Sequence, residues 1–163
     1  LLGMAYYFSR KFNEAIAEGE KTLTMAPDYV PAYLWLGMAY EQTNKYTDAV
    51  AILMKGKTKT SGKNAKLNAL LAHAQAKSGN ISAASSELDE LSIRAKRGYI
   101  SQYNFARIYI ALGEETKALE CLTQAFDERA TWLTWIKVDP AFDALHDLPK
   151  FQELMENMNF PKN

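Results

Sequence analysis

The sequence predicts an all-α fold of antiparallel helix pairs stacked side by side, and two observations predict it. Apolar residues recur at helical spacing almost throughout the chain, and no convincing run of strict alternation occurs. The second observation is a period of 34 residues, by which Gly3, Tyr6 and Ala15 recur as Gly37, Tyr40 and Ala49. A period near 34 that holds two helices indicates a stacked array, in which each pair covers the apolar side of the next.

The period continues through the second half of the chain. Ala72, Gly79, Ala84 and Leu88 recur 34 residues later as Ala106, Gly113, Ala118 and Leu122. A single step of 35 residues, from Gly37 to Ala72, joins the two halves. The loosest stretch, residues 60–64, lies in that interval and is expected to absorb the extra residue.

The helical pattern and its breaks predict eight helices, at about 1–9, 12–25, 29–43, 46–58, 64–78, 81–96, 99–112 and 115–128. Pro31 suits a first helical turn, where its missing N–H has no partner anyway. Gly79 and Gly113 are expected to end their helices at positive φ. Because the loops are short, successive helices should be antiparallel.

Small residues at repeated positions predict close approach within each pair. Gly37, Ala72 and Ala106 fall on first helices, and Ala49, Ala84 and Ala118 fall on second helices. A bulky side chain at either place would hold the two helices apart.

This pattern resembles the tetratricopeptide repeat (TPR). The best match is the second unit, with Tyr33, Leu36-Gly37, Tyr40, Ala49 and Leu53. The resemblance implies a right-handed superhelix over residues 1–128, with a truncated first repeat at 1–28 and further repeats at 29–62, 63–98 and 99–128. Residues 129–163 are then a C-terminal capping segment.

The tail is rich in large apolar residues, which we expect to cover the last helix of the array. These residues are Trp132, Trp135, Phe142, Leu145, Phe151, Leu154 and Met155. The tail also resembles the end of TPR regions at the C-terminus of bacterial signalling proteins that carry a winged-helix, adenylate cyclase or kinase domain. Leu148-Pro149 departs from the Asp-Pro usual there. The resemblance implies a docking or sensory part of a regulatory protein in signalling or transcription regulation.

Composition excludes several other functions. Nineteen basic and nineteen acidic residues cancel, so no global field favours nucleic acid or an acidic membrane. The chain contains no run of about 18 apolar residues, which a membrane-spanning helix would need. We expect a cytoplasmic protein. One cysteine and two isolated histidines predict no metal site and no internal disulfide. No nucleophile motif or phosphate loop is present, so we expect neither a cofactor nor an enzyme.

In TPR arrays the first helix of each pair lines the concave groove, and projecting the helical spacing gives the side chains expected there. The groove should change from apolar and methionine-rich to polar and basic along the array. The expected partner-binding residues are Met4, Tyr7, Leu34, Met38, Glu41, Lys66, His73, Lys77, Tyr103, Asn104 and Arg107.

Three functions remain open. The first is a non-catalytic module that binds a protein or peptide in the groove. The second is a small-molecule sensor with a pocket near His73, Tyr103 and Arg107. The third is an oligomerisation element, because the chain opens inside a first helix, as a fragment would, and the apolar start at residues 1–8 suits pairing with a second copy.

Overall fold

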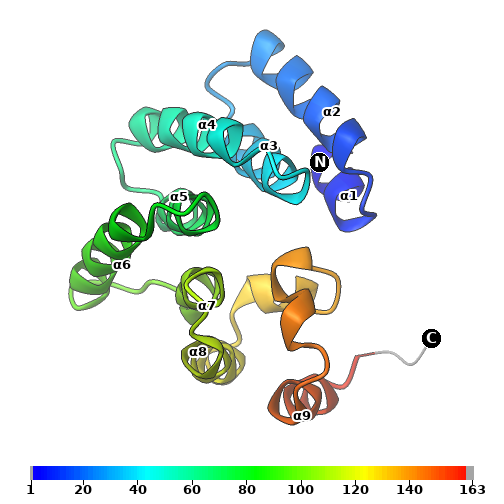
Figure 1. The fold of residues 1–163 in the computed structure, drawn as a ribbon, viewed down its shortest axis with the longest axis vertical. Coiled ribbons are helices and arrows are strands. Elements are labelled where there is room, and N and C mark those ends of the chain that lie inside the picture. Colours follow the sequence, from blue (N-terminus) through cyan, green and yellow to red (C-terminus); the bar gives the residue numbers. More distant parts are fainter. Residues whose placement is uncertain (1, 161–163) are drawn as a thin grey trace.

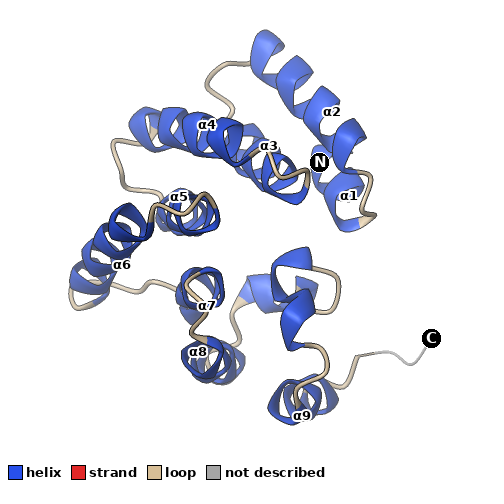
Figure 2. Ribbon diagram, in the orientation of Figure 1, coloured by secondary structure: helices blue, strands red, loops and turns tan. Residues whose placement is uncertain are grey.

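Four antiparallel helix pairs make up most of the protein in the computed structural model, which describes residues 2–160. Helices account for all the regular structure of that stretch (Figure 2). The predicted all-α fold is therefore confirmed, and the observed bounds agree closely with the expected ones. The pairs are α1 (Leu2–Phe8) with α2 (Phe12–Met25), α3 (Val30–Gln42) with α4 (Tyr46–Lys59), α5 (Ala65–Lys77) with α6 (Ile81–Ala95), and α7 (Gln102–Ala111) with α8 (Glu115–Asp127).

The pairs are arranged as an arc, with the first helix of each pair on the inside. Figure 1 shows α1, α3, α5 and α7 along the concave side and α2, α4, α6 and α8 along the convex side. Each inner helix packs against the next inner helix as well as against its own partner. The inner helices therefore share one continuous concave face.

Two glycines explain how closely the helices approach. A Cβ added at Gly37 would lie 2.5 Å from Cγ of Leu53, so the predicted close contact of α3 with α4 is confirmed. A Cβ at Gly56 would lie 2.8 Å from Cβ of Tyr33 and 2.9 Å from Leu67. Gly56 stands within a basic run, and sequence analysis gave it no packing role. It allows α4 to approach both α3 and α5.

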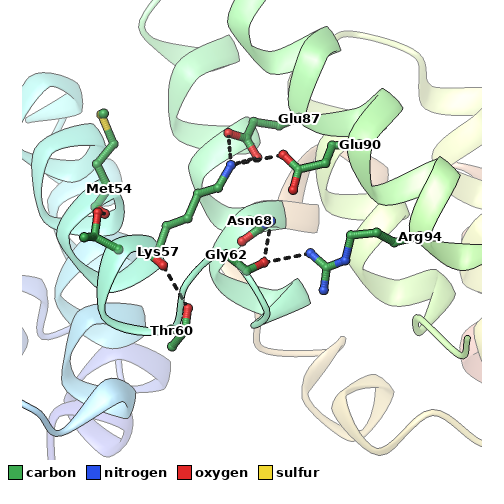
Figure 3. Close-up of polar contacts among 9 residues, drawn as sticks. Met54, Lys57, Thr60, Gly62, Asn68, Glu87, Glu90 and Arg94 are labelled. Atoms are coloured by element: carbon green, nitrogen blue, oxygen red, sulfur yellow. Dashed lines mark hydrogen bonds and ion pairs between the residues drawn. The ribbon is translucent and has the colours of Figure 1, made fainter.

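The turn at residues 60–64 absorbs the extra residue, as predicted. Gly62 adopts a φ of +70°, and its carbonyl accepts hydrogen bonds from Asn68 at 3.2 Å and from the Arg94 guanidinium at 2.8 Å. Nearby, the Lys57 ammonium joins Glu87 at 2.6 Å and Glu90 at 3.2 Å (Figure 3). Contacts from α5 and α6 therefore fix the irregular joint between the second and third pairs.

The chain after α8 enters the arc before it reaches the end of the array. Two 3₁₀ helices, η1 (Thr131–Trp135) and η2 (Pro140–Leu145), lie inside the arc, and α9 (Pro149–Asn157) packs against α8 (Figure 1). We call residues 131–145 the groove segment.

Part of the predicted cap has a different place. Phe151 and Leu154 of α9 are buried in the same core as α7 and α8, as a cap requires. The expectation that Trp132 and Trp135 cover the last helix is met only in part, since Trp132 packs against the core that α7 and α8 share but also stacks on Trp35. Because the groove segment crosses the concave face, their rings contact the first two repeats.

Candidate functional site

The groove segment meets the concave face through stacked aromatic rings. Trp132 lies on Trp35 of α3, with ring centroids 5.3 Å apart and planes 9° apart. Trp135 lies on Phe8 of α1 at 4.5 Å and 7°. Offset stacking of such rings contributes about 0.5–1.5 kcal/mol beyond the burial of their area. All three tryptophans of the chain therefore lie where the groove segment meets the concave face.

Asp139 anchors the groove segment at its centre. Its carboxylate accepts hydrogen bonds from the hydroxyl of Tyr7 at 3.2 Å and the hydroxyl of Tyr103 at 2.6 Å. It also accepts from Nη1 of Arg107 at 2.5 Å and from the backbone N–H of Ala141 at 3.1 Å. The Asp139 side chain is fully buried. The first and last repeats thus meet on one carboxylate of the groove segment.

The electrostatics of this anchor keep its donors protonated. Burial, and then the negative charge of Asp139, raises the pKa of both Tyr7 and Tyr103 well above 10. Burial is the largest single effect on Arg107 and lowers its pKa, but the combined attraction of Asp139, the two tyrosines and Glu41 exceeds it, so the pKa lies above its usual value. The tyrosines therefore remain neutral donors while the guanidinium carries the positive charge that Asp139 needs.

A second ion pair lies at the rim of the groove. Nη1 and Nη2 of Arg10, in the turn after α1, donate to the two carboxylate oxygens of Asp143, both at 2.8 Å. Both side chains are about half exposed, so the pair contributes little to stability despite its bidentate geometry. It contributes to the register of the segment on α1.

Most of the predicted partner-binding residues are buried in this structure. Lys66 and Lys77 are exposed and Met4 is partly buried. The ammonium of Lys66 lies 4.5 Å from the centre of the Trp132 ring. The other eight are buried: Tyr7, Leu34, Met38, Glu41, His73, Tyr103, Asn104 and Arg107. The concave face is therefore occupied in this structure by the chain itself.

Three of the predicted residues converge, whereas sequence analysis missed their common partner. Tyr7, Tyr103 and Arg107 meet on Asp139, a residue that is not among those expected to bind a partner. Tyr103 and Arg107 lie one helical turn apart on the same face of α7. Tyr103 and Arg107 are two strong donors on a concave, largely apolar face, and buried donors of this kind require an acceptor. That requirement is the signal by which an acid elsewhere in the chain could have been found.

Beside the anchor, Glu41 and His73 form a second buried polar group. Nδ1 of His73 lies 3.1 Å from Oε2 of Glu41, and Nη2 of Arg107 lies 4.0 Å from the same oxygen. The side chains of Glu41 and His73 are 1% and 2% exposed. Met4, Met38, His73 and Arg107 occupy equivalent positions, because steps of 34, 35 and 34 residues separate them. The same repeat position therefore changes from methionine to histidine and arginine along the array.

Residues 2–160 contain neither a cluster of metal-ligating side chains nor a helix that could span a membrane. No group of three or more His, Cys, Asp or Glu side chains in that range is placed to hold a metal ion. None of the helices described there is both long and apolar enough to cross a membrane.

The sequence was compared with models of known protein families and with curated proteins. Family models of the tetratricopeptide repeat match residues 9–60 and residues 99–130, which together make up just over half of the chain. No curated protein matches the chain. Proteins with these repeats generally act as non-catalytic scaffolds that mediate protein–protein interaction. With its inner and outer helices and its concave groove, the chain belongs to the tetratricopeptide repeat family.

Proposed function

We propose that this chain is the C-terminal docking or sensory part of a larger bacterial regulatory protein, in signalling or transcription regulation, and that its groove binds a protein segment. In this proposal the module is cytoplasmic, is not an enzyme and makes no direct contact with nucleic acid. The observation that carries the proposal is the occupied groove. Its concave face holds a short segment of chain through two stacked tryptophans and one buried aspartate.

The groove segment also indicates the chemistry of a partner. A competing segment would present two aromatic rings to Phe8 and Trp35, and a carboxylate to Tyr7, Tyr103 and Arg107. Peptide recognition of this kind uses aromatic anchors and charge-assisted hydrogen bonds in a preformed groove. The partner is therefore a protein segment rich in aromatic residues that carries an aspartate or glutamate. It binds after the groove segment leaves.

The test weakens the internal segment in the full chain and supplies the same segment as a peptide. A W132A/W135A chain should bind a synthetic peptide of residues 130–146, and the wild-type chain should bind it at least about tenfold more weakly, a difference of 1.4 kcal/mol. The same peptide with D139N is the matched control and should not bind. Equal binding of both peptides would contradict the proposal, as would no binding to a folded W132A/W135A chain.

A small-molecule sensor is the second candidate, and the observation that favours it is a polar pocket beside Glu41 and His73. The third possibility is pairing of two chains through residues 1–8. The groove segment covers part of the surface that such pairing would use. Tyr7 is buried and Phe8 is stacked on Trp135, although Leu2 remains 48% exposed. Leu1, which belongs to the same apolar start, lies outside the described residues.

A further inference from the structure

A polar pocket remains beside the start of η2, where the groove segment does not fill the concave face. Between the end of α3, the end of α5 and the start of η2 lies a pocket of about 150 Å³. Glu41 and His73 belong to its buried side, and Asn44 and Lys77 are exposed. Pro140 and Ala141 of the groove segment form one wall, and Gln42 and Tyr46 complete the lining.

The buried side of this pocket contains polar atoms that nothing in the described chain satisfies. Both carboxylate oxygens of Glu41 and both ring nitrogens of His73 lack a hydrogen-bond partner there. The His73 and Glu41 atoms that approach to 3.1 Å are close enough to bond but too poorly aligned. A buried acceptor without a donor costs about 1–3 kcal/mol, and more when it is charged. The pocket therefore lies against a buried acceptor that the described chain leaves unpaired.

The balance of buried charge indicates the sign of the ligand group. Glu41 and Asp139 are two buried carboxylates, and Arg107 is the single buried guanidinium beside them. Arg107 donates to Asp139 and stays 4.0 Å from Glu41, and the His73 ring at 3.1 Å forms no hydrogen bond with Glu41, so Glu41 lacks the hydrogen-bonded counter-charge that Asp139 has. A buried carboxylate without a direct counter-charge is strongly unfavourable. A positively charged donor, such as an ammonium group, would complete the site.

The exposed side of the pocket has the opposite chemistry. The Lys77 ammonium forms no ion pair with any residue from 2 to 160. The Asn44 carbonyl oxygen accepts from the Tyr46 hydroxyl at 2.8 Å, which leaves the Asn44 amide N–H groups free to donate. Lys77 and Asn44 suit an acidic group near the mouth.

We infer that this pocket binds a small zwitterion of the amino-acid class, with its ammonium group on Glu41 and its carboxylate toward Lys77. The inference rests on the sensor function and not on peptide docking, so the two can fail separately. Because Pro140 and Ala141 form one wall, the pocket is complete only when the groove segment is in place. The zwitterion therefore stabilises the occupied groove and opposes its displacement by a partner.

The test is calorimetric titration and thermal unfolding of the full chain with glycine, β-alanine and γ-aminobutyrate. Propylamine and propionate, which carry one charge each, are the controls. At least one zwitterion should bind and raise Tm, and each singly charged compound should bind at least about tenfold more weakly, a difference of 1.4 kcal/mol. Failure of all three zwitterions at millimolar concentration would overturn the inference, and so would equal or tighter binding of propionate.

Substitutions locate the binding. Glu41→Gln should abolish zwitterion binding, and Lys77→Ala should reduce it to the level of propylamine. Glu14→Gln on α2 and Lys55→Ala on α4, both exposed and outside the pocket, are the matched controls and should bind as the wild type does. Undiminished binding to folded Glu41→Gln would overturn the inference. If that variant does not fold, Lys77→Ala decides, because full selectivity for zwitterions in it would contradict the assignment.

Discussion

The guanidinium of Arg107 and the carboxylate of Asp139 form a buried ion pair, 2.5 Å between Nη1 and Oδ2, that joins the last repeat to the segment that follows it. Neither side chain is more than 2% exposed. Two tyrosine hydroxyls and the Ala141 N–H satisfy the remaining capacity of Asp139, which gives the carboxylate the additional hydrogen bonds that a buried ion pair requires. This contact anchors the chain in its own groove, together with the stacked tryptophans.

Removal of the Asp139 charge should destabilise the whole protein. Asp139→Asn leaves Arg107 buried without its counter-charge, and we expect the free energy of unfolding to fall by about 3–5 kcal/mol. The matched control is Asp143→Asn, which breaks the half-exposed pair with Arg10 and should cost less than about 1 kcal/mol. Urea denaturation measures both. Equal effects of the two substitutions would show that Asp139 does not anchor the segment.

Alkaline pH should weaken the fold through Tyr7 and Tyr103. The folded pKa of each lies well above the value of about 10 in an unfolded chain, because burial and Asp139 oppose the phenolate. The folded state therefore holds its protons more tightly. Its stability is complete below pH 10 and is lost as the pH rises above 10, by up to about 1.4 kcal/mol per pH unit for each tyrosine.

Denaturation curves from pH 9 to pH 11.5 measure this loss. Tyr7→Phe should show a shallower decline above pH 10 than the wild type. Tyr29→Phe, which changes a tyrosine that is 45% exposed, should keep the wild-type slope. A slope unchanged by Tyr7→Phe would contradict the role given to the buried hydroxyl.

Cys121 should be nearly inert to alkylation in the folded protein. Burial, followed by the nearby charge of Glu120, raises the pKa of its thiol from 9.0 to about 11. Only the thiolate reacts, so two units of pKa slow the reaction at pH 8 by roughly 100-fold, before any steric shielding is counted. The measurement is the rate of iodoacetamide modification by mass spectrometry. The urea-unfolded chain is the control, and equal rates in both states would be incompatible with the structure.

Gly56 should tolerate no side chain. Gly56→Ala gains about 1 kcal/mol of helix propensity, but its Cβ would meet Cβ of Tyr33 at 2.8 Å, an atom that moves only with the backbone of α3. Overpacking of this kind costs about 1–3 kcal/mol, so Tm should fall. Gly98→Ala is the control, because nothing lies within 4 Å of a Cβ there and its φ is not positive. A Tm of Gly56→Ala at or above that of Gly98→Ala would show that the close approach is not required.

The helices and their pairing could be predicted because they depend on local pattern. The glycines at 79 and 113 and the small residue at 37 each act within one pair, and the structure confirms them. Gly56 was missed because its contacts come from two helices, only one of which is its partner. The repeat pattern identifies residues that recur at equivalent positions. It carries no signal for a contact that one residue makes with the next pair.

The candidate site could be predicted only as far as it depends on the local helical pattern. Helical spacing placed Tyr7, Tyr103 and Arg107 on the concave face, where the structure has them. The occupant of that face could not be predicted, since Trp132 and Asp139 belong to no repeat and reach partners distant in the sequence. Apolar residues after the last repeat are equally compatible with a terminal cap and with a segment that folds back, and only the three-dimensional path distinguishes the two.

Amide hydrogen exchange tests most directly whether the groove is held closed by Asp139. In the wild-type chain residues 131–145 should be protected together with α3, α5 and α7, and Asp139→Asn should increase exchange in residues 131–145 on the order of 100-fold, the equivalent of about 2.7 kcal/mol. The outer helices α4 and α6 should retain more of their protection than residues 131–145. Exchange of residues 131–145 in the wild-type chain at the rate of an unstructured peptide would contradict an occupied groove.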